Sequence, residues 1–216
     1  MRVLLIAALL ALVPATLLAQ NDGRWKEGVH YHVIEQQSNV SDDKVLVEEI
    51  FSYACPHCNS FQPIINPWHE QLPGDVSFKR LPAVFSRSWE PYARAYLTFE
   101  AMGITEQTHQ PLFNALHREH KPLRRIQEIA DYVSTLGVDK GKFLSTSESF
   151  AVNGRLNQAQ TLVRRYGITG TPSLVIDGKY RISAGGEVAT YADMLAVADF
   201  LIAKQRQARG NVVAAN

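Results

Sequence analysis

The sequence predicts an α/β fold with an inserted all-helical subdomain, and three observations lead to this prediction. A strand-like run, a helix start and a second strand-like run follow one another over residues 45–81. Helical periodicity then fills residues 88–152, before two short β-rich runs and a last amphipathic helix. A strand–helix–strand unit implies a right-handed crossover and a parallel pair of strands. Helices that interrupt the strands are better explained as an insertion than as further sheet.

Residues 1–19 are expected to be a secretory signal peptide. Arg2 supplies a positive charge, residues 3–13 form an unbroken apolar run, and Leu17-Leu18-Ala19 is an acceptable cleavage triplet. An apolar core of this length is short for a bilayer span, although a retained N-terminal membrane anchor is the alternative. Export places the mature chain in an oxidising compartment.

The mature chain is expected to form a discontinuous α/β domain (residues 20–86 and 153–208), a helical insertion (87–152) and a flexible tail (209–216). The formal net charge is +1, and Lys and Arg are scattered along the chain. Because no basic stripe is present, nucleic acid is not expected as a partner. The chain leaves no room for an added dimerisation domain before its first strand, and we expect a monomer.

The first two strands are predicted on either side of a turn. Residues 29–34 alternate as an edge strand does, and residues 41–43 mark a turn. Val45–Phe51 is apolar enough for a strand that is buried on both faces. Alternation sends Glu48 and Glu49 to opposite faces, so we expect at least one to be partly buried. The alternative is a strand end where both carboxylates reach water.

A helix and a second strand follow. Pro56 favours the first turn of a helix. Further along, Pro63 and Pro67 predict that this helix kinks or breaks before Leu72. Residues 76–81 alternate like a strand, which completes the βαβ unit.

The insertion is predicted to hold three helices. Ser88 can cap the first, which ends at Gly103. The second surrounds residues 112–116. The third follows the apolar helical interval from Leu123 and ends at Gly137.

The C-terminal part is predicted to be a helix, a hairpin and a closing helix. Helical spacing covers residues 156–166 and stops at Gly167. The dipeptide Asp177-Gly178 between two β-rich runs is a strong hairpin signal. Thr190 and Asp193 together can cap the last helix.

The only two cysteines, Cys55 and Cys58, flank Pro56 and His57 at the start of the first helix. Positions i and i+3 share a helix face, so the two sulfurs can come within disulfide reach. Unpaired N–H groups and the helix dipole favour a thiolate at Cys55, and we expect His57 to be the largest side-chain stabiliser. Since a thiolate attacks disulfides and leaves from them, the motif indicates a redox dithiol that needs no cofactor beyond its own disulfide.

Two other interpretations of the cysteine pair stay open. A lone C-x-x-C can be half of a zinc site, although the sequence offers no second cysteine pair and no suitably spaced histidine pair. The pair can also be a static disulfide that braces the fold, although so short a loop removes little unfolded-state entropy. We therefore expect no metal.

Together the predicted elements resemble the thioredoxin fold: a βαβ unit, a dithiol at a helix start, a Thr-Pro turn, a hairpin and a closing helix. The motif Cys55-Pro56-His57-Cys58 after Phe51-Ser52-Tyr53 resembles that of the DsbA family of bacterial periplasmic oxidants. The helical insertion and the export signal fit the same family. The resemblance covers essentially the whole mature chain.

The resemblance implies a role for each site residue. Cys55 would be the exposed attacking thiolate and Cys58 the buried resolving thiol. Gly170, Thr171 and Pro172 would bind an extended substrate peptide, with Pro172 in the cis form and facing the dithiol.

The resemblance also implies a proton relay. Glu49 matches the acidic residue beneath the active site and would serve Cys58. Where family members often carry a second acid, this chain has Gln62. Lys79 or Arg80 is a possible charge partner for Glu49.

The implied function is a dithiol oxidase that donates its disulfide to reduced exported proteins. A DsbB-like, quinone-linked membrane oxidase would reoxidise it. A disulfide reductase or isomerase on the same fold is the alternative, and a metal-binding or chaperone-like module is the third. Stoichiometric oxidation of a thiol peptide without metal would separate the third from the first two.

Overall fold

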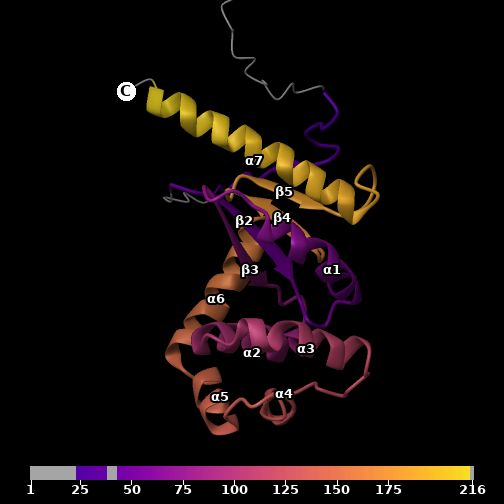
Figure 1. The fold of residues 1–216 in the computed structure, drawn as a ribbon, viewed down its shortest axis with the longest axis vertical. Helices are drawn as coiled ribbons and strands as arrows, with labels where there is room; N and C mark the ends of the chain where they lie inside the picture. Colours follow the sequence, from indigo (N-terminus) through magenta and orange to yellow (C-terminus); the bar gives the residue numbers. More distant parts are fainter. Residues whose placement is uncertain (1–22, 38–42, 215–216) are drawn as a thin grey trace, which may run out of the picture.

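The structure, a computed structural model, describes residues 23–37 and 43–214 and forms a mixed five-stranded sheet with helices on both faces. The sheet order is β1-β5-β4-β2-β3. Helices α2 to α5 gather beyond one end of the sheet, and α6 runs from them back along it (Figure 1). The strands are β1 (His32–Val33), β2 (Val45–Phe51), β3 (Val76–Pro82), β4 (Ser173–Ile176) and β5 (Tyr180–Ser183). The helices are α1 (Pro56–Glu70), α2 (Glu90–Met102), α3 (Thr105–His117), α4 (Ile126–Ser134), α5 (Lys140–Ser147), α6 (Phe150–Arg165) and α7 (Tyr191–Ala214), with a 3-10 turn η1 (Arg87–Trp89).

Strand β2 is the centre of the fold, as its apolar sequence predicts. It pairs in parallel with β3 and antiparallel with β4, and all of its residues are buried. The β4–β5 hairpin turns at Asp177 and Gly178, whose φ angles are 56° and 62°. Two successive left-handed residues are typical of the turn that matches strand twist, so the hairpin prediction is confirmed. The predicted edge strand exists but shortens to β1, which pairs with β5.

The two faces of β2 meet different helices. Helices α1 and α7 cover one face, where Phe61 and Leu201 belong to one apolar cluster. Helix α6 covers the other, where Val163 packs with Ile50. Adjacent residues of β2 therefore point into different layers of the molecule.

The sequence predicted that Pro63 and Pro67 kink or break the first helix, and the structure shows no break. Helix α1 continues through both prolines to Glu70. Phe61 and Ile65 are fully buried beside them. Burial of two large apolar side chains contributes about 1.5–3 kcal/mol each, which is comparable to the cost of about 3 kcal/mol for each of the two internal prolines.

Helices α2 and α4 of the insertion start later than their sequence signals suggest. Ser88 does not cap the first helix, because it lies within η1 and its hydroxyl contacts that of Ser86 at 2.8 Å. Helix α2 begins at Glu90, with Pro91 in its first turn, and ends at Gly103 with a φ of 68° as predicted. Leu123 lies before α4, whereas α5 was not among the three predicted helices.

The C-terminal helix is longer than predicted. Thr190 and Asp193 form the expected reciprocal cap, with 3.1 and 3.0 Å hydrogen bonds. However, α7 runs to Ala214, so residues 209–214 of the expected flexible tail are helical. Arg206 and Arg209 hold this end through ion pairs of 2.6 Å to Asp75 and Asp177.

Some predictions fall on residues that the structure does not describe, namely the signal peptide (1–19) and the start of the turn at 41–43. The expected boundary between residues 152 and 153 lies inside α6, so this helix belongs to both parts of the fold. Within residues 23–37 and 43–214, no helix is both long and apolar enough for a bilayer span.

Candidate active site

The two cysteines lie at the N-terminus of α1, as the sequence predicts. Cys55 is the residue that precedes the helix, and Pro56 occupies its first position. Both cysteines are free thiols. Cys58 is fully buried as expected, whereas Cys55, which was expected to be exposed, is only 6% exposed. Ser52 fixes the approach to the helix, because its carbonyl accepts a 3.1 Å hydrogen bond from the Cys55 N–H. The sulfur of Cys55 therefore faces the open end of the helix, where backbone N–H groups have no partner within it.

The surroundings of the two sulfurs favour a thiolate at Cys55 and a protonated thiol at Cys58. Donation from the Cys58 thiol is the largest cause that lowers the pKa of Cys55, from 9.0 to about 5, against the opposing effect of burial. The Thr171 side chain and the N–H groups of Cys58 and His57 lower it further. Burial, followed by the neighbouring Cys55, raises the pKa of Cys58 well above its usual range. At neutral pH one sulfur is thus a ready nucleophile while the other holds its proton.

His57 does not make the expected largest side-chain contribution. Its imidazole is exposed, and it acts on the Cys55 sulfur through its backbone N–H, whereas the Cys58 thiol dominates. An exposed group interacts through water of high dielectric constant, which weakens its effect on a buried sulfur. The His57 carbonyl is in turn held by the Tyr191 hydroxyl, which donates to it at 3.1 Å.

The Thr171-Pro172 peptide bond is cis, which confirms the form expected from the resemblance. The Thr171 carbonyl oxygen lies 3.3 Å from the Cys55 sulfur, which donates to it in the thiol form. The Thr171 hydroxyl oxygen is buried and, among the described residues, has no hydrogen-bond partner. Since the Thr171 side chain lowers the pKa of Cys55, its hydroxyl is suited to donate to the thiolate.

A groove of about 370 Å³ lies beside the dithiol. It is lined by His57, by residues 169–173 and 183–185, and by Tyr191. The three residues expected to bind substrate, Gly170, Thr171 and Pro172, therefore lie together in its wall.

Glu49 lies on the α1 side of β2 and is fully buried, whereas Glu48 points the other way and is 6% exposed. The alternative that both carboxylates reach water is therefore wrong. Arg80, rather than Lys79, pairs with Glu49 at 2.8 Å. Burial raises the pKa of Glu49, and Arg80 opposes this; the charge of Glu49 in turn helps to raise the pKa of Cys58.

Comparison with known proteins agrees with this site. Residues 79–196 match the family described as DSBA-like thioredoxin domain. The thiol:disulfide interchange protein DsbA of Pseudomonas aeruginosa is 42% identical over 212 residues, which cover 96% of this chain and 99% of the relative. Its counterpart in Pseudomonas syringae is 41% identical over 215 residues, 96% of this chain and 98% of the relative. The chain belongs to the DsbA family.

Solved structures show the same relationship. The crystal structure of Pseudomonas aeruginosa DsbA superposes with a TM-score of 0.82 at 42% identity, over 87% of this chain and 97% of that one. The oxidoreductase DsbA from Xylella fastidiosa gives a TM-score of 0.76 at 29% identity, over 82% and 96%. This DsbA-family protein thus has the DsbA-like thioredoxin fold with its helical insertion, and it is a thiol:disulfide oxidoreductase whose C-x-x-C motif is Cys55–Cys58.

One buried polar residue near the dithiol segment was not singled out from the sequence. His109, on α3 of the insertion, is 5% exposed, and its ring contacts Gln62 at 3.1 Å and Tyr53 at 2.7 Å. Its signal in the sequence is weak but present. It stands one helical turn before the buried Leu112 and Phe113, so it lies on the apolar face of α3.

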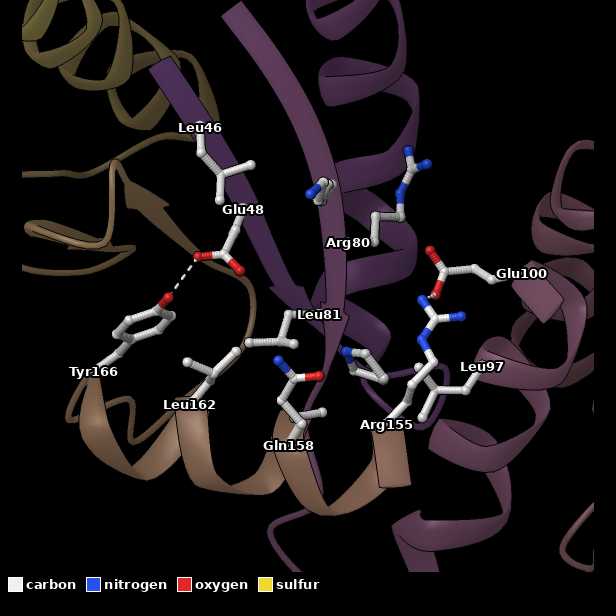
Figure 2. Close-up of a pocket in the computed structure, with 13 residues that line it drawn as sticks. Leu46, Glu48, Arg80, Leu81, Leu97, Glu100, Arg155, Gln158, Leu162 and Tyr166 are labelled. Atoms are coloured by element: carbon white, nitrogen blue, oxygen red, sulfur yellow. Dashed lines mark hydrogen bonds and ion pairs between the residues drawn. The ribbon is translucent and has the colours of Figure 1, made fainter. Parts of the chain in front are cut away.

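A second cavity, of about 320 Å³, lies between the sheet and α6 (Figure 2). Glu48 points into it and accepts a 2.8 Å hydrogen bond from the Tyr166 hydroxyl. This cavity is on the face of β2 opposite to α1 and does not include the dithiol. The described part of the chain contains no group of three or more His, Cys, Asp or Glu that could hold a metal ion.

Proposed function

We propose that this DsbA-family protein is a periplasmic dithiol oxidase that donates the Cys55–Cys58 disulfide to reduced, newly exported proteins. The observation that carries the proposal is the position of Cys55 just before α1, where the Cys58 thiol, the Thr171 side chain and backbone N–H groups act together to lower its pKa. The donors that lower it stabilise only the reduced form, in which Cys55 is a thiolate. Whatever stabilises the reduced form makes the disulfide readier to be given away.

The reaction follows from the different surroundings of the two sulfurs. A substrate thiolate attacks Cys55, the Cys55–Cys58 bond breaks, and Cys58 leaves with the electron pair and takes up a proton. A second substrate thiolate then attacks the substrate sulfur of the mixed disulfide, and Cys55 leaves as a stable thiolate. The substrate dithiol is oxidised to a disulfide, and the two cysteines of the enzyme are reduced.

The remaining site residues are proposed to support these steps. Glu49 supplies the proton that Cys58 takes up, because its buried carboxyl has a raised pKa near that thiol. Gly170, Thr171 and Pro172 hold an extended substrate peptide in the groove beside Cys55, since backbone groups of an open segment can pair with a strand.

The proposal includes export and reoxidation. Residues 1–19 are proposed to act as the signal peptide that brings the chain to the periplasm. A DsbB-like, quinone-linked membrane oxidase is proposed to return the cysteines to the disulfide, and reduced exported proteins are the proposed substrates. The protein is proposed to act as a monomer.

The test is a redox titration of the purified protein against glutathione, combined with oxidation of a reduced two-thiol peptide without metal. We expect a couple that is more oxidising than glutathione, and loss of two peptide thiols per enzyme disulfide. Cys55→Ser is the matched control and should oxidise no peptide. A couple more reducing than glutathione would overturn the proposal and favour the reductase or isomerase alternative.

A further inference from the structure

A buried chain of hydrogen bonds joins the segment before Cys55 to Glu49. The Tyr53 hydroxyl lies 2.7 Å from Nδ1 of His109, and Nε2 of His109 lies 3.1 Å from Oε1 of Gln62. Nε2 of Gln62 donates to Oε1 of Glu49 at 2.9 Å. His109 is 5% exposed and the other three are fully buried, so water cannot replace a broken link.

The donor and the acceptor of each hydrogen bond in this network follow from the groups that meet at Glu49. Nε of Arg80 donates to Oε2 of Glu49 at 2.8 Å, so both carboxylate oxygens already accept hydrogen bonds. Because the Gln62 amide nitrogen faces Glu49, its oxygen faces His109. Nε2 of His109 therefore carries the proton, and Nδ1 accepts from the Tyr53 hydroxyl. Burial keeps this ring neutral by lowering the pKa of His109 well below its usual range.

We propose that His109 is a positioning residue for the exchange reaction, which holds the Gln62 amide so that it donates to Glu49 and favours the carboxylate that Glu49 becomes when it gives its proton to Cys58. If the amide turned over, its oxygen would face Glu49 and favour the protonated carboxyl. That turn would set the amide N–H groups against the N–H of His109, or it would require the ring proton to move to Nδ1. In the second case the buried Tyr53 hydroxyl would lose the one acceptor that the structure records for it. The helical insertion thus controls the protonation of a group in the sheet domain.

The consequence reaches the dithiol through charge. An ionised Glu49 disfavours a second negative charge on Cys58, so Cys58 keeps the proton that it donates to the Cys55 thiolate. During exchange, Cys58 leaves the disulfide as a thiolate and takes its proton from the Glu49 carboxyl, which becomes a carboxylate. This inference rests on the proposed role of Glu49 in that step.

Other titratable and charged groups act on the same chain. These groups lie on three elements: Arg80 on β3, Tyr96 and Glu100 on α2, and Cys58 and His69 on α1. A substitution at His109 leaves all of them in place. Its effect on Glu49 can therefore be measured as a difference from the unchanged protein.

The test is the pKa of the Glu49 carboxyl in the reduced full-length protein, followed by carbon NMR of labelled glutamate. His109→Leu is expected to raise it by about one pH unit, a tenfold change, since one hydrogen bond to a charged group is lost. His109→Gln should restore the original value, because its amide nitrogen can donate to Gln62 in place of Nε2. Glu49→Gln identifies the resonance.

Two further variants keep the outcome decisive. His117→Leu is the matched control, because His117 also lies on α3 and donates to the Tyr53 carbonyl at 2.7 Å but makes no contact with Gln62 that the structure records. Tyr53→Phe replaces His109→Leu if that variant does not fold, and we expect a smaller rise in the same direction. An unchanged Glu49 pKa in the variant that folds, or an equal rise in His117→Leu, would overturn the proposal.

The titration uses no substrate and no second redox couple, so it does not depend on the proposed oxidase direction. If the glutathione titration overturned the oxidase proposal, the effect of His109 on the Glu49 pKa would still stand. Conversely, an unchanged exchange rate in Glu49→Gln would remove the role of Glu49 as proton donor, even if His109 sets its pKa.

Discussion

Reduction of the Cys55–Cys58 disulfide is expected to change folding stability in a way that depends on pH. The folded-state pKa of Cys55 is depressed, from 9.0 to about 5. The thiolate therefore contributes stability that is complete above the unfolded pKa, declines below it, and is lost as pH falls through the folded pKa. The oxidised protein has no thiolate and lacks this dependence.

The magnitude follows from the size of the shift. Because pH 7 lies about two units above the folded-state pKa, the thiolate stabilises the reduced folded form at this pH by about 2.7 kcal/mol, at 1.36 kcal/mol per unit. Water in the adjoining groove screens part of this interaction, and we expect roughly half of that value. The disulfide closes a loop of only four residues, which stabilises the oxidised form by about 2 kcal/mol. The stabilities of the two forms should thus become equal at one pH between about 6.5 and 8, and the reduced form should be the more stable just above that pH.

The assay is denaturant unfolding of both forms from acidic to mildly alkaline pH, analysed as free energies of unfolding. The oxidised form should be the more stable at pH 4, and its advantage should shrink steadily as pH rises. Cys55→Ser is the control, because a hydroxyl does not ionise and the variant should show no such gain. A stability difference between the two forms that does not vary with pH would refute the reasoning.

Three further substitutions test single contacts. Thr171→Val should raise the pKa of Cys55, because valine cannot donate to the thiolate; an unchanged midpoint in an ultraviolet titration of the thiolate contradicts this. His57→Ser should leave the equilibrium constant with glutathione nearly unchanged, because serine keeps the backbone N–H and the lost imidazole is exposed; a clearly weaker oxidant would contradict this. Glu48→Gln should raise the free energy of unfolding at pH 7 by about 1 kcal/mol, since the amide can still accept from Tyr166 but buries no charge; a loss of stability counts against this.

Elements with strong local signals could be predicted from the sequence. The start of α1 at Pro56, the end of α2 at Gly103 and the hairpin turn at Asp177-Gly178 all depend on the backbone preferences of the residues themselves. The cap of α7 by Thr190 depends on a partner only three positions away. Such signals act over a few residues, so no knowledge of the rest of the chain is needed.

Elements that depend on packing were predicted less well. Pro63 lies inside α1 because neighbouring side chains are buried against the sheet and α7, which outweighs the local preference to break the helix. The end of α7 is helical because Arg209 reaches Asp177 in the hairpin, which is 32 positions away. Neither partner can be recognised from the residues near the helix itself.

The sequence by itself determined the reactive pair, because Cys55 and Cys58 are three positions apart at a helix start, and helix geometry alone brings their sulfurs together. Only the tertiary structure decided what surrounds them. Thr171 meets Cys55 across 116 positions, and His109 meets Gln62 across 47. The pKa of a buried group depends on the donors and charges around it, so the chemistry of the pair is set by contacts that exist only after the insertion has packed against the sheet domain.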